Sequence, residues 1–232
     1  MIRKKIVVLT GAGISAESGI NTFRDSGGLW EGHDVMEVAS PQGWAKNMDL
    51  VLEFYNLRRQ QLKEVTFNQG HKALVDLEKY HDVVIITQNV DDLHERAGSK
   101  HVIHLHGELK KVRSVNDENL ITVTTENIKR GDLASDGHQL RPHIVWFGEM
   151  VPMLDIASKE LLDADIVIII GTSMQVYPAA GLVSFAPSSS QIIYIDPRPT
   201  ISHELTQAKN LTVIEATATH GVPRLVRELC ED

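Results

Sequence analysis

The sequence predicts an α/β fold, with a doubly wound parallel sheet and a smaller inserted lobe. Short, β-branched, continuously apolar runs recur along the chain, and segments with helical periodicity lie between them. Strands that are apolar on both sides are covered on both faces, which is typical of a parallel sheet between helices. The alternation of such strands with helices indicates βαβ units. Ligands in these sheets bind beyond the carboxyl ends of the strands, so functional residues should follow the apolar runs.

The expected strands of this sheet are five apolar runs, at residues 6–9, 83–86, 166–170, 192–195 and 211–214. Helical periodicity between them is clearest at residues 93–97, 153–163 and 222–229. We expect a single domain of 232 residues, with the sheet and its helices built from residues 1–24, 71–106 and 141–232. Residues 25–70 carry a glycine-rich turn and then helical periodicity, and residues 107–140 are polar and interrupted by glycines. These two insertions are expected to form the small lobe.

Composition and charge exclude several classes of protein. Hydrophobic residues make up 42% of the chain and charged residues 23%, which excludes the disordered and fibrous classes. The net charge is −8 and no long run of Lys or Arg occurs, so we expect neither nucleic acid nor a membrane as a partner. The apolar runs stay far below the roughly 18 residues of a membrane span, and the first one ends at Gly11 without a cleavage-type segment. We therefore expect a cytoplasmic protein.

A glycine-rich turn directly follows the first expected strand. Residues 11–19 read Gly-Ala-Gly-Ile-Ser-Ala-Glu-Ser-Gly and fit the G-x-G-x-x-[G/A] pattern of a Rossmann-like dinucleotide site. Glycines let the backbone approach a pyrophosphate, and the next helix offers its N–H groups to that charge. A tight turn without a ligand is the alternative. The acidic residue that usually binds the adenosine ribose about 20 positions later has no clear counterpart, so a dinucleotide would be held differently.

Further motifs follow in a distinctive order. They are Gly-Ile-Asn-Thr-Phe-Arg at 19–24, Gly-Gly-Leu-Trp at 27–30, Thr-Gln-Asn-Val-Asp at 87–91, His-Leu-His-Gly at 104–107, Leu-Arg-Pro-His-Ile-Val-Trp-Phe-Gly-Glu at 140–149 and Gly-Thr-Ser at 171–173. In this order and spacing, the set resembles the sirtuin family of NAD-dependent protein deacylases, over about residues 5–220. The resemblance implies NAD as co-substrate and an acylated lysine of a protein or peptide as substrate.

The resemblance also implies roles for individual residues. His106 is the implied catalytic base, with Asn89 as a second catalytic residue. Arg24 would neutralise phosphate, and Asp196 stands where Asn is common in the family. The implied NAD contacts are Gly11, Ala12, Gly13, Ala16, Glu17, Thr22, Phe23, Arg24, Gln88, Asn89, Asp91, Gly171, Thr172, Ser173 and Asp196. The segment implied to pair with the substrate peptide as an added strand contains Val145, Phe147, Gly148 and Glu149.

In the implied reaction, the carbonyl oxygen of an acyl-lysine attacks the anomeric carbon of NAD as nicotinamide leaves. A base then removes a proton from a ribose hydroxyl, which lets that hydroxyl attack the imidate carbon, and water finally releases free lysine and O-acyl-ADP-ribose. An imidazole titrates near 6.5, so His106 can accept this proton at neutral pH. An NAD glycohydrolase or ADP-ribosyltransferase stays open, as does an NAD-sensing module without turnover. His106 and residues 145–149 favour deacylation, because simple NAD hydrolysis requires neither.

The sequence predicts that no metal is bound. His104 and His106 share a face of an expected strand and could ligate a metal or simply pack, but no third ligand is identifiable nearby. Most sirtuins carry two Cys-x-x-Cys pairs that bind a structural zinc, whereas residues 114–117 read Ser-Val-Asn-Asp and the second pair is absent. Cys230 is the sole cysteine, and oxygen ligands do not replace a thiolate site. The small lobe should then fold around Leu120, Ile121, Val123, Ile128 and Leu133.

Two residues of the first insertion suggest the acyl group. In sirtuins that prefer acidic acyl groups, a Tyr and an Arg spaced by three lie on one helix face over the acyl pocket, and Tyr55 and Arg58 match this spacing. A guanidinium and a phenol can bind a carboxylate with charge-assisted hydrogen bonds. The resemblance therefore implies succinyl or malonyl groups as well as acetyl groups. An exposed helix with a surface Arg pair is the alternative.

Overall fold

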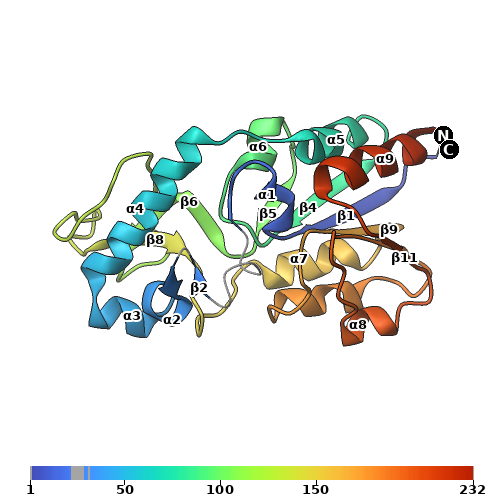
Figure 1. Ribbon diagram of the computed structural model, residues 1–232. Helices are drawn as coiled ribbons and strands as arrows, with labels where there is room; N and C mark the ends of the chain where they lie inside the picture. The colour runs from blue at the N-terminus through green and yellow to red at the C-terminus, as the bar shows by residue number, and fades with distance from the viewer. Residues whose placement is uncertain (1, 22–28, 31, 232) are drawn as a thin grey trace.

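A six-stranded parallel sheet forms the larger part of the computed structural model (Figure 1). The structure describes residues 2–21, 29–30 and 32–231. The strands are β1 (Lys5–Thr10), β4 (Asp82–Thr87), β5 (Val102–His104), β9 (Ile166–Ile170), β10 (Gln191–Ile195) and β11 (Leu211–Ile214). Their order in the sheet is β11-β10-β9-β1-β4-β5, so the winding reverses between β1 and β9. The doubly wound parallel sheet is confirmed, and its switch point lies where β1 and β9 end.

Helices cover both faces of this sheet, as its continuously apolar strands require. Ile6 and Val8 of β1 pack under α5 (Gln69–Leu77) and α9 (Ala218–Glu231). Val7 and Leu9 point to the opposite face, which is covered by α7 (Leu154–Leu161), the 3-10 helix η2 (Ala179–Phe185) and α8 (His203–Thr206). Figure 1 shows these two layers above and below the strands. No helix within the described residues combines the length and apolarity needed to cross a membrane.

A smaller lobe lies beside the sheet, on the left of Figure 1. It contains an antiparallel sheet of β6 (Gly107–Ser114), β7 (Ile121–Val123) and β8 (Leu140–Ile144) in the order β7-β6-β8. Its other elements are β2 (Leu29–Trp30), β3 (His33–Asp34), α2 (Val35–Val38), α3 (Pro41–Lys46) and α4 (Met48–Glu64). Residues 141–144, expected in the large sheet, instead pair with β6. The apolar pattern of β8 does not reveal this, because both sheets need an apolar face.

The expected core of the small lobe is wrong in three of its five residues. Ile121, Val123 and Leu133 are exposed by 43%, 69% and 56%, whereas Ile128 is buried. Short β7 is an edge strand, so most of its surface stays in solvent. One buried cluster of the lobe is Leu52, Val112 and Ile128, with Trp44, Met48 and Leu140 packed against it, and a second contains Val51, Phe54 and Tyr55 of α4. The core of the small lobe is therefore formed by side chains of α4 together with those of the strands.

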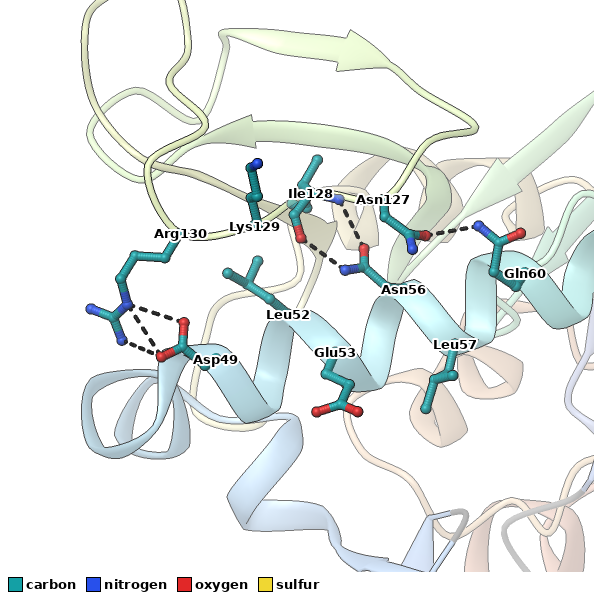
Figure 2. Close-up of a pocket in the computed structure, with 10 residues that line it drawn as sticks. All are labelled: Asp49, Leu52, Glu53, Asn56, Leu57, Gln60, Asn127, Ile128, Lys129 and Arg130. Atoms are coloured by element: carbon teal, nitrogen blue, oxygen red, sulfur yellow. Dashed lines mark hydrogen bonds and ion pairs between the residues drawn. The ribbon is translucent and has the colours of Figure 1, made fainter.

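Hydrogen bonds and an ion pair connect the loop after β7 to α4, as Figure 2 shows. The Asn56 side chain donates to the Ile128 carbonyl at 2.8 Å and accepts from the Ile128 N–H at 3.0 Å. Gln60 donates to Asn127 at 2.8 Å, and Arg130 pairs with Asp49 through Nε at 3.0 Å. A groove of about 390 Å³ lies between the helix and this loop. The loop is thus held by pairing with one helix.

Candidate active site

A cleft of about 390 Å³ lies at the carboxyl ends of β1, β4 and β9, where the small lobe meets the large sheet. Most of the predicted site residues line it: Gly11, Ala12, Gly13, Ala16, Glu17, Gln88, Asn89, Asp91, His106, Val145, Phe147, Gly148, Glu149, Gly171, Thr172, Ser173 and Asp196. Thr22, Phe23 and Arg24 fall outside the described residues. The described lining includes neither Tyr55 nor Arg58. The site residues are therefore brought together from six separate parts of the chain.

Two glycine turns meet at the switch point of the sheet. The Gly13 N–H donates to the Gly171 carbonyl at 2.8 Å, and a Cβ on Gly13 would lie 2.5 Å from the Gly171 Cα. Gly171 adopts a φ of +59°, which favours glycine. Side chains at these positions would push the ends of β1 and β9 apart. The glycines thus keep the floor of the cleft as bare backbone, which a phosphate can approach.

A buried polar chain runs from the loop after β4 to the first turn. Asn89 Nδ2 donates to Ser15 Oγ at 3.2 Å, and Ser15 Oγ donates to Asp91 Oδ2 at 3.0 Å. The other oxygen of Asp91 accepts from the Leu93 N–H at 3.1 Å. Burial raises the pKa of Asp91, while the hydrogen bonds from Leu93 and Ser15 oppose that rise. Ser15 escaped the sequence-based assignment, although it lies inside the first motif.

His106 presents one ring nitrogen with a free lone pair. Its Nδ1 lies 3.1 Å from the Gln88 carbonyl oxygen, which only accepts, so Nδ1 carries the hydrogen. Nε2 is then the basic nitrogen of the neutral ring. Burial lowers the pKa of His106, so the ring stays neutral at pH 7. A neutral imidazole on the wall of a cleft is suited to accept a proton from a bound hydroxyl.

Glu17 and Asp196 lie on the cleft wall, but protein donors occupy their carboxylates. Glu17 accepts from the Thr219 N–H at 3.0 Å and from the Thr219 hydroxyl at 2.6 Å. Burial acts to raise the pKa of Glu17, but these hydrogen bonds lower it overall. Asp196 accepts from the Arg198 N–H at 2.8 Å. Glu17 therefore ties the first turn to the start of α9.

The segment after β8 is fixed from both sides. The Val145 N–H donates to the His106 carbonyl at 3.0 Å, and the Phe147 N–H donates to the Ala39 carbonyl at 2.9 Å. The Glu149 carboxylate accepts from Arg141 at 2.6 and 3.2 Å and from the Trp146 N–H at 2.8 Å. The Glu149 side chain thus turns back toward β8 and stabilises the conformation of residues 145–149.

We expect Glu149→Gln to loosen this segment. Losing charge-assisted hydrogen bonds should lower the free energy of unfolding by about 2 kcal/mol. The KM for an acyl-peptide should rise more than the KM for NAD, because residues 145–149 are the predicted peptide-binding segment. Denaturant unfolding and steady-state kinetics measure the two effects. Glu108→Gln, which removes a partly exposed pair with Lys111, is the matched control and should change neither quantity noticeably. Equal rises of the two KM values would contradict the assignment.

Tyr55 and Arg58 lie on α4, one layer behind the cleft wall. The Tyr55 side chain is fully buried, and its hydroxyl accepts from Trp146 Nε1 at 3.0 Å. Burial raises the pKa of Tyr55. The Arg58 guanidinium lies over the Phe54 ring, 5.1 Å from its centre. Trp30, which lines the cleft, packs edge-on against Phe54 and Tyr55, so this face of α4 supports the wall.

Comparison with known proteins agrees with this geometry. Residues 11–178 match the model of the Sir2 family. An "NAD-dependent protein deacylase" of Helicobacter pylori is 56% identical over 228 residues, which cover 98% of each chain. A solved "Sir2 homolog-NAD complex" superposes with a TM-score of 0.86 at 40% identity, covering 98% of this chain and 90% of the other. A structure of "Sir2 bound to acetylated peptide" gives 0.79 at 28% identity, covering 96% and 92%.

Proposed function

This chain belongs to the Sir2 family and is an NAD-dependent protein deacylase, and from that premise we propose how its cleft works. We propose that His106 is the general base, and that residues 145–148 hold the acyl-lysine peptide by main-chain pairing. One observation carries this proposal: the His106 backbone bonds to Val145, while the His106 ring bonds to the loop that carries Asn89. Hydrogen bonds of His106 therefore connect the proposed base directly to the proposed peptide-binding segment and to the loop that carries Asn89.

The described residues fit NAD as co-substrate. The glycine turns at 11–13 and 171 leave room for phosphates, and Asn89 and Asp91 offer buried polar groups beside the first turn. NAD supplies an anomeric carbon from which nicotinamide can leave. The chain supplies orientation through Asn89, Ser15 and Asp91, and His106 Nε2 accepts the proton of a ribose hydroxyl. Apolar residues Ile144, Trp146 and Val151 on the same wall help to exclude water from the reacting groups.

We propose further that the enzyme removes succinyl and malonyl groups as well as acetyl groups. Tyr55 and Arg58 are one turn apart on α4, and Tyr55 contacts Trp30 and Trp146, two residues that line the cleft. The Arg58 guanidinium lies over Phe54, the ring that supports Trp30. A cation in this layer is the feature that favours an acyl group ending in a carboxylate. The acidic net charge of the chain supports a protein or peptide partner rather than nucleic acid or a membrane.

One experiment separates the functions that share this scaffold. Purified protein is mixed with NAD, with and without a peptide carrying acetyl-lysine or succinyl-lysine, and nicotinamide is quantified. Release that depends on the peptide is the expected result. Release without peptide would identify an NAD glycohydrolase, and no release with either peptide would identify an NAD-sensing module.

We also propose that the small lobe folds without zinc. Where the family places its first cysteine pair, Ser114 Oγ donates to Asp136 Oδ2 at 2.7 Å and accepts from the Asn116 N–H at 3.0 Å. These hydrogen bonds, and those from residues 127–130 to α4, supply the cross-links that a metal would otherwise supply.

Metal analysis of the purified protein should therefore find no stoichiometric zinc, because the chain has no thiolate set to bind it. A chelator should leave the melting temperature unchanged. Ser114→Ala should lower the free energy of unfolding by about 1 kcal/mol through loss of the Asp136 bond. Ser158→Ala, which removes an exposed bond to the Asp155 carbonyl, is the control and should have little effect. One tightly bound zinc ion per chain would overturn the proposal.

A further inference from the structure

His104 is a buried histidine with two partners that the proposed mechanism leaves unused. Its Nδ1 lies 3.1 Å from the Asn89 carbonyl oxygen, and its Nε2 lies 2.7 Å from Glu95 Oε1. The side chain of His104 is 7% exposed, while that of Glu95, on α6 (Leu93–Ala97), is 40% exposed. The ring is therefore held between the loop after β4 and a helix that starts just beyond that loop.

The two partners determine the protonation of the ring. A carbonyl oxygen only accepts, so Nδ1 carries a hydrogen, and an ionised carboxylate only accepts, so Nε2 carries one too. His104 is then an imidazolium ion paired with Glu95. Burial opposes this charge, but the hydrogen bond that His104 donates to Glu95 raises the pKa of His104 overall. A charge-assisted donor therefore faces the Asn89 carbonyl.

Residues 104–106, at and after the end of β5, bind three consecutive carbonyl groups at and after the end of β4. The Leu105 N–H donates to the Thr87 carbonyl at 2.9 Å, and His106 Nδ1 donates to the Gln88 carbonyl. His104 Nδ1 holds the third, that of Asn89. The backbone of Asn89 therefore depends on His104, and its side chain points to Ser15 and the buried carboxylate of Asp91. A shift of this backbone would move a polar group on the wall of the NAD cleft.

We propose that His104 is a positioning residue for NAD cleavage: its Nδ1–H fixes the Asn89 carbonyl and so places the Asn89 side chain against the bound co-substrate. The proposal rests on the deacylase function. It separates the two histidines of the His-Leu-His-Gly motif, because His106 acts on the reacting atoms and His104 acts through Asn89. Both ring nitrogens of His104 are engaged by protein partners.

Two substitutions separate the partners of His104, since an Asn amide nitrogen occupies the place of Nδ1 and a Gln amide nitrogen occupies that of Nε2. His104→Asn keeps the bond to the Asn89 carbonyl, whereas His104→Gln keeps only the bond to Glu95. A displacement of about 1 Å can cost roughly 100-fold in rate. We therefore expect His104→Gln to lower kcat for peptide-dependent nicotinamide release by about 10- to 100-fold, and His104→Asn to stay within about threefold of wild type.

The control is Glu95→Gln, which leaves a neutral His104 that still donates from Nδ1, and it should also stay near wild type. The KM for the acetyl-lysine peptide should not change in any of the three variants. If His104→Asn and His104→Gln behave alike, whether both are active or both are impaired, the positioning role is wrong.

A second measurement needs no variant. Nitrogen NMR of the His104 ring in the wild-type enzyme at neutral pH should show hydrogens on both nitrogens, and an Nδ1 without a hydrogen would overturn the proposal.

If the wild type releases no nicotinamide with either acyl-peptide, the deacylase function itself fails. NAD affinity then replaces kcat as the readout. His104→Gln is expected to bind NAD about tenfold more weakly, a loss of about 1.4 kcal/mol, and His104→Asn to bind it like wild type. Equal affinities in the two variants would refute the role of His104.

Discussion

His106→Asn should lower the rate of deacylation by about 100- to 10,000-fold, the usual effect of removing a positioned general base. The Asn side chain can still donate to the Gln88 carbonyl, as His106 Nδ1 does, so the loop after β4 should keep its position. The substitution removes only Nε2, the nitrogen with the free lone pair. Binding of NAD should therefore be largely unchanged.

Steady-state deacylation of an acetyl-lysine peptide and calorimetric titration with NAD measure these two quantities. His138→Ala is the matched control, because His138 lies in the small lobe with 52% of its side chain exposed. The control should behave like wild type. Activity of His106→Asn within a few-fold of wild type would remove His106 from the mechanism.

Arg58→Met should reduce kcat/KM for a succinyl-lysine peptide by roughly 10- to 100-fold, because a hydrogen bond to a charged group contributes about 1.5–3 kcal/mol. The Arg58→Met variant should process the acetyl-lysine peptide almost as well as wild type, since an acetyl group has no carboxylate for a guanidinium to bind. Methionine keeps much of the apolar contact with Phe54, so the support behind Trp30 should persist.

The measurement is kcat/KM on one peptide sequence carrying either acyl group. Lys63→Met is the control, since Lys63 is an exposed residue in the last turn of the same helix. It should affect neither substrate. A loss that is equal for the two substrates would reduce Tyr55 and Arg58 to a structural layer behind the cleft wall.

Most of the large sheet could be predicted from the sequence, because a strand buried on both faces needs a continuous apolar run. The five expected runs all became strands of one sheet. The sixth, β5, was expected only as a strand that carries both His104 and His106, but it has three residues, Val102–His104, and ends before His106. Its place at the edge of the sheet depends on pairing with β4, which no local pattern reveals.

The small lobe was harder to predict, because its core depends on contacts between distant segments. Val123 looks like a core residue in the sequence but lies on an edge strand, whereas Leu52 on α4 completes the core. The end of the second insertion was misplaced for the same reason, since β8 pairs with β6 and not with the large sheet.

Motifs located the candidate site, but they did not show which way its charged side chains face. His106, Asn89 and Asp91 all line the cleft. Glu149 turns back onto Arg141, a partner that only the folded loop brings near. Glu95, which pairs with His104, lies nine residues earlier on a helix and carries no motif signal of its own. The sequence therefore identified the residues of the cleft better than their individual partners.

The most direct test of the proposed chemistry is to quantify three products of one reaction by mass spectrometry. Wild-type protein is incubated with NAD and an acyl-lysine peptide, and nicotinamide, deacylated peptide and O-acyl-ADP-ribose are measured together. Acyl transfer in the cleft predicts that all three form in equal amounts. Formation of nicotinamide and ADP-ribose with the peptide still acylated would contradict it.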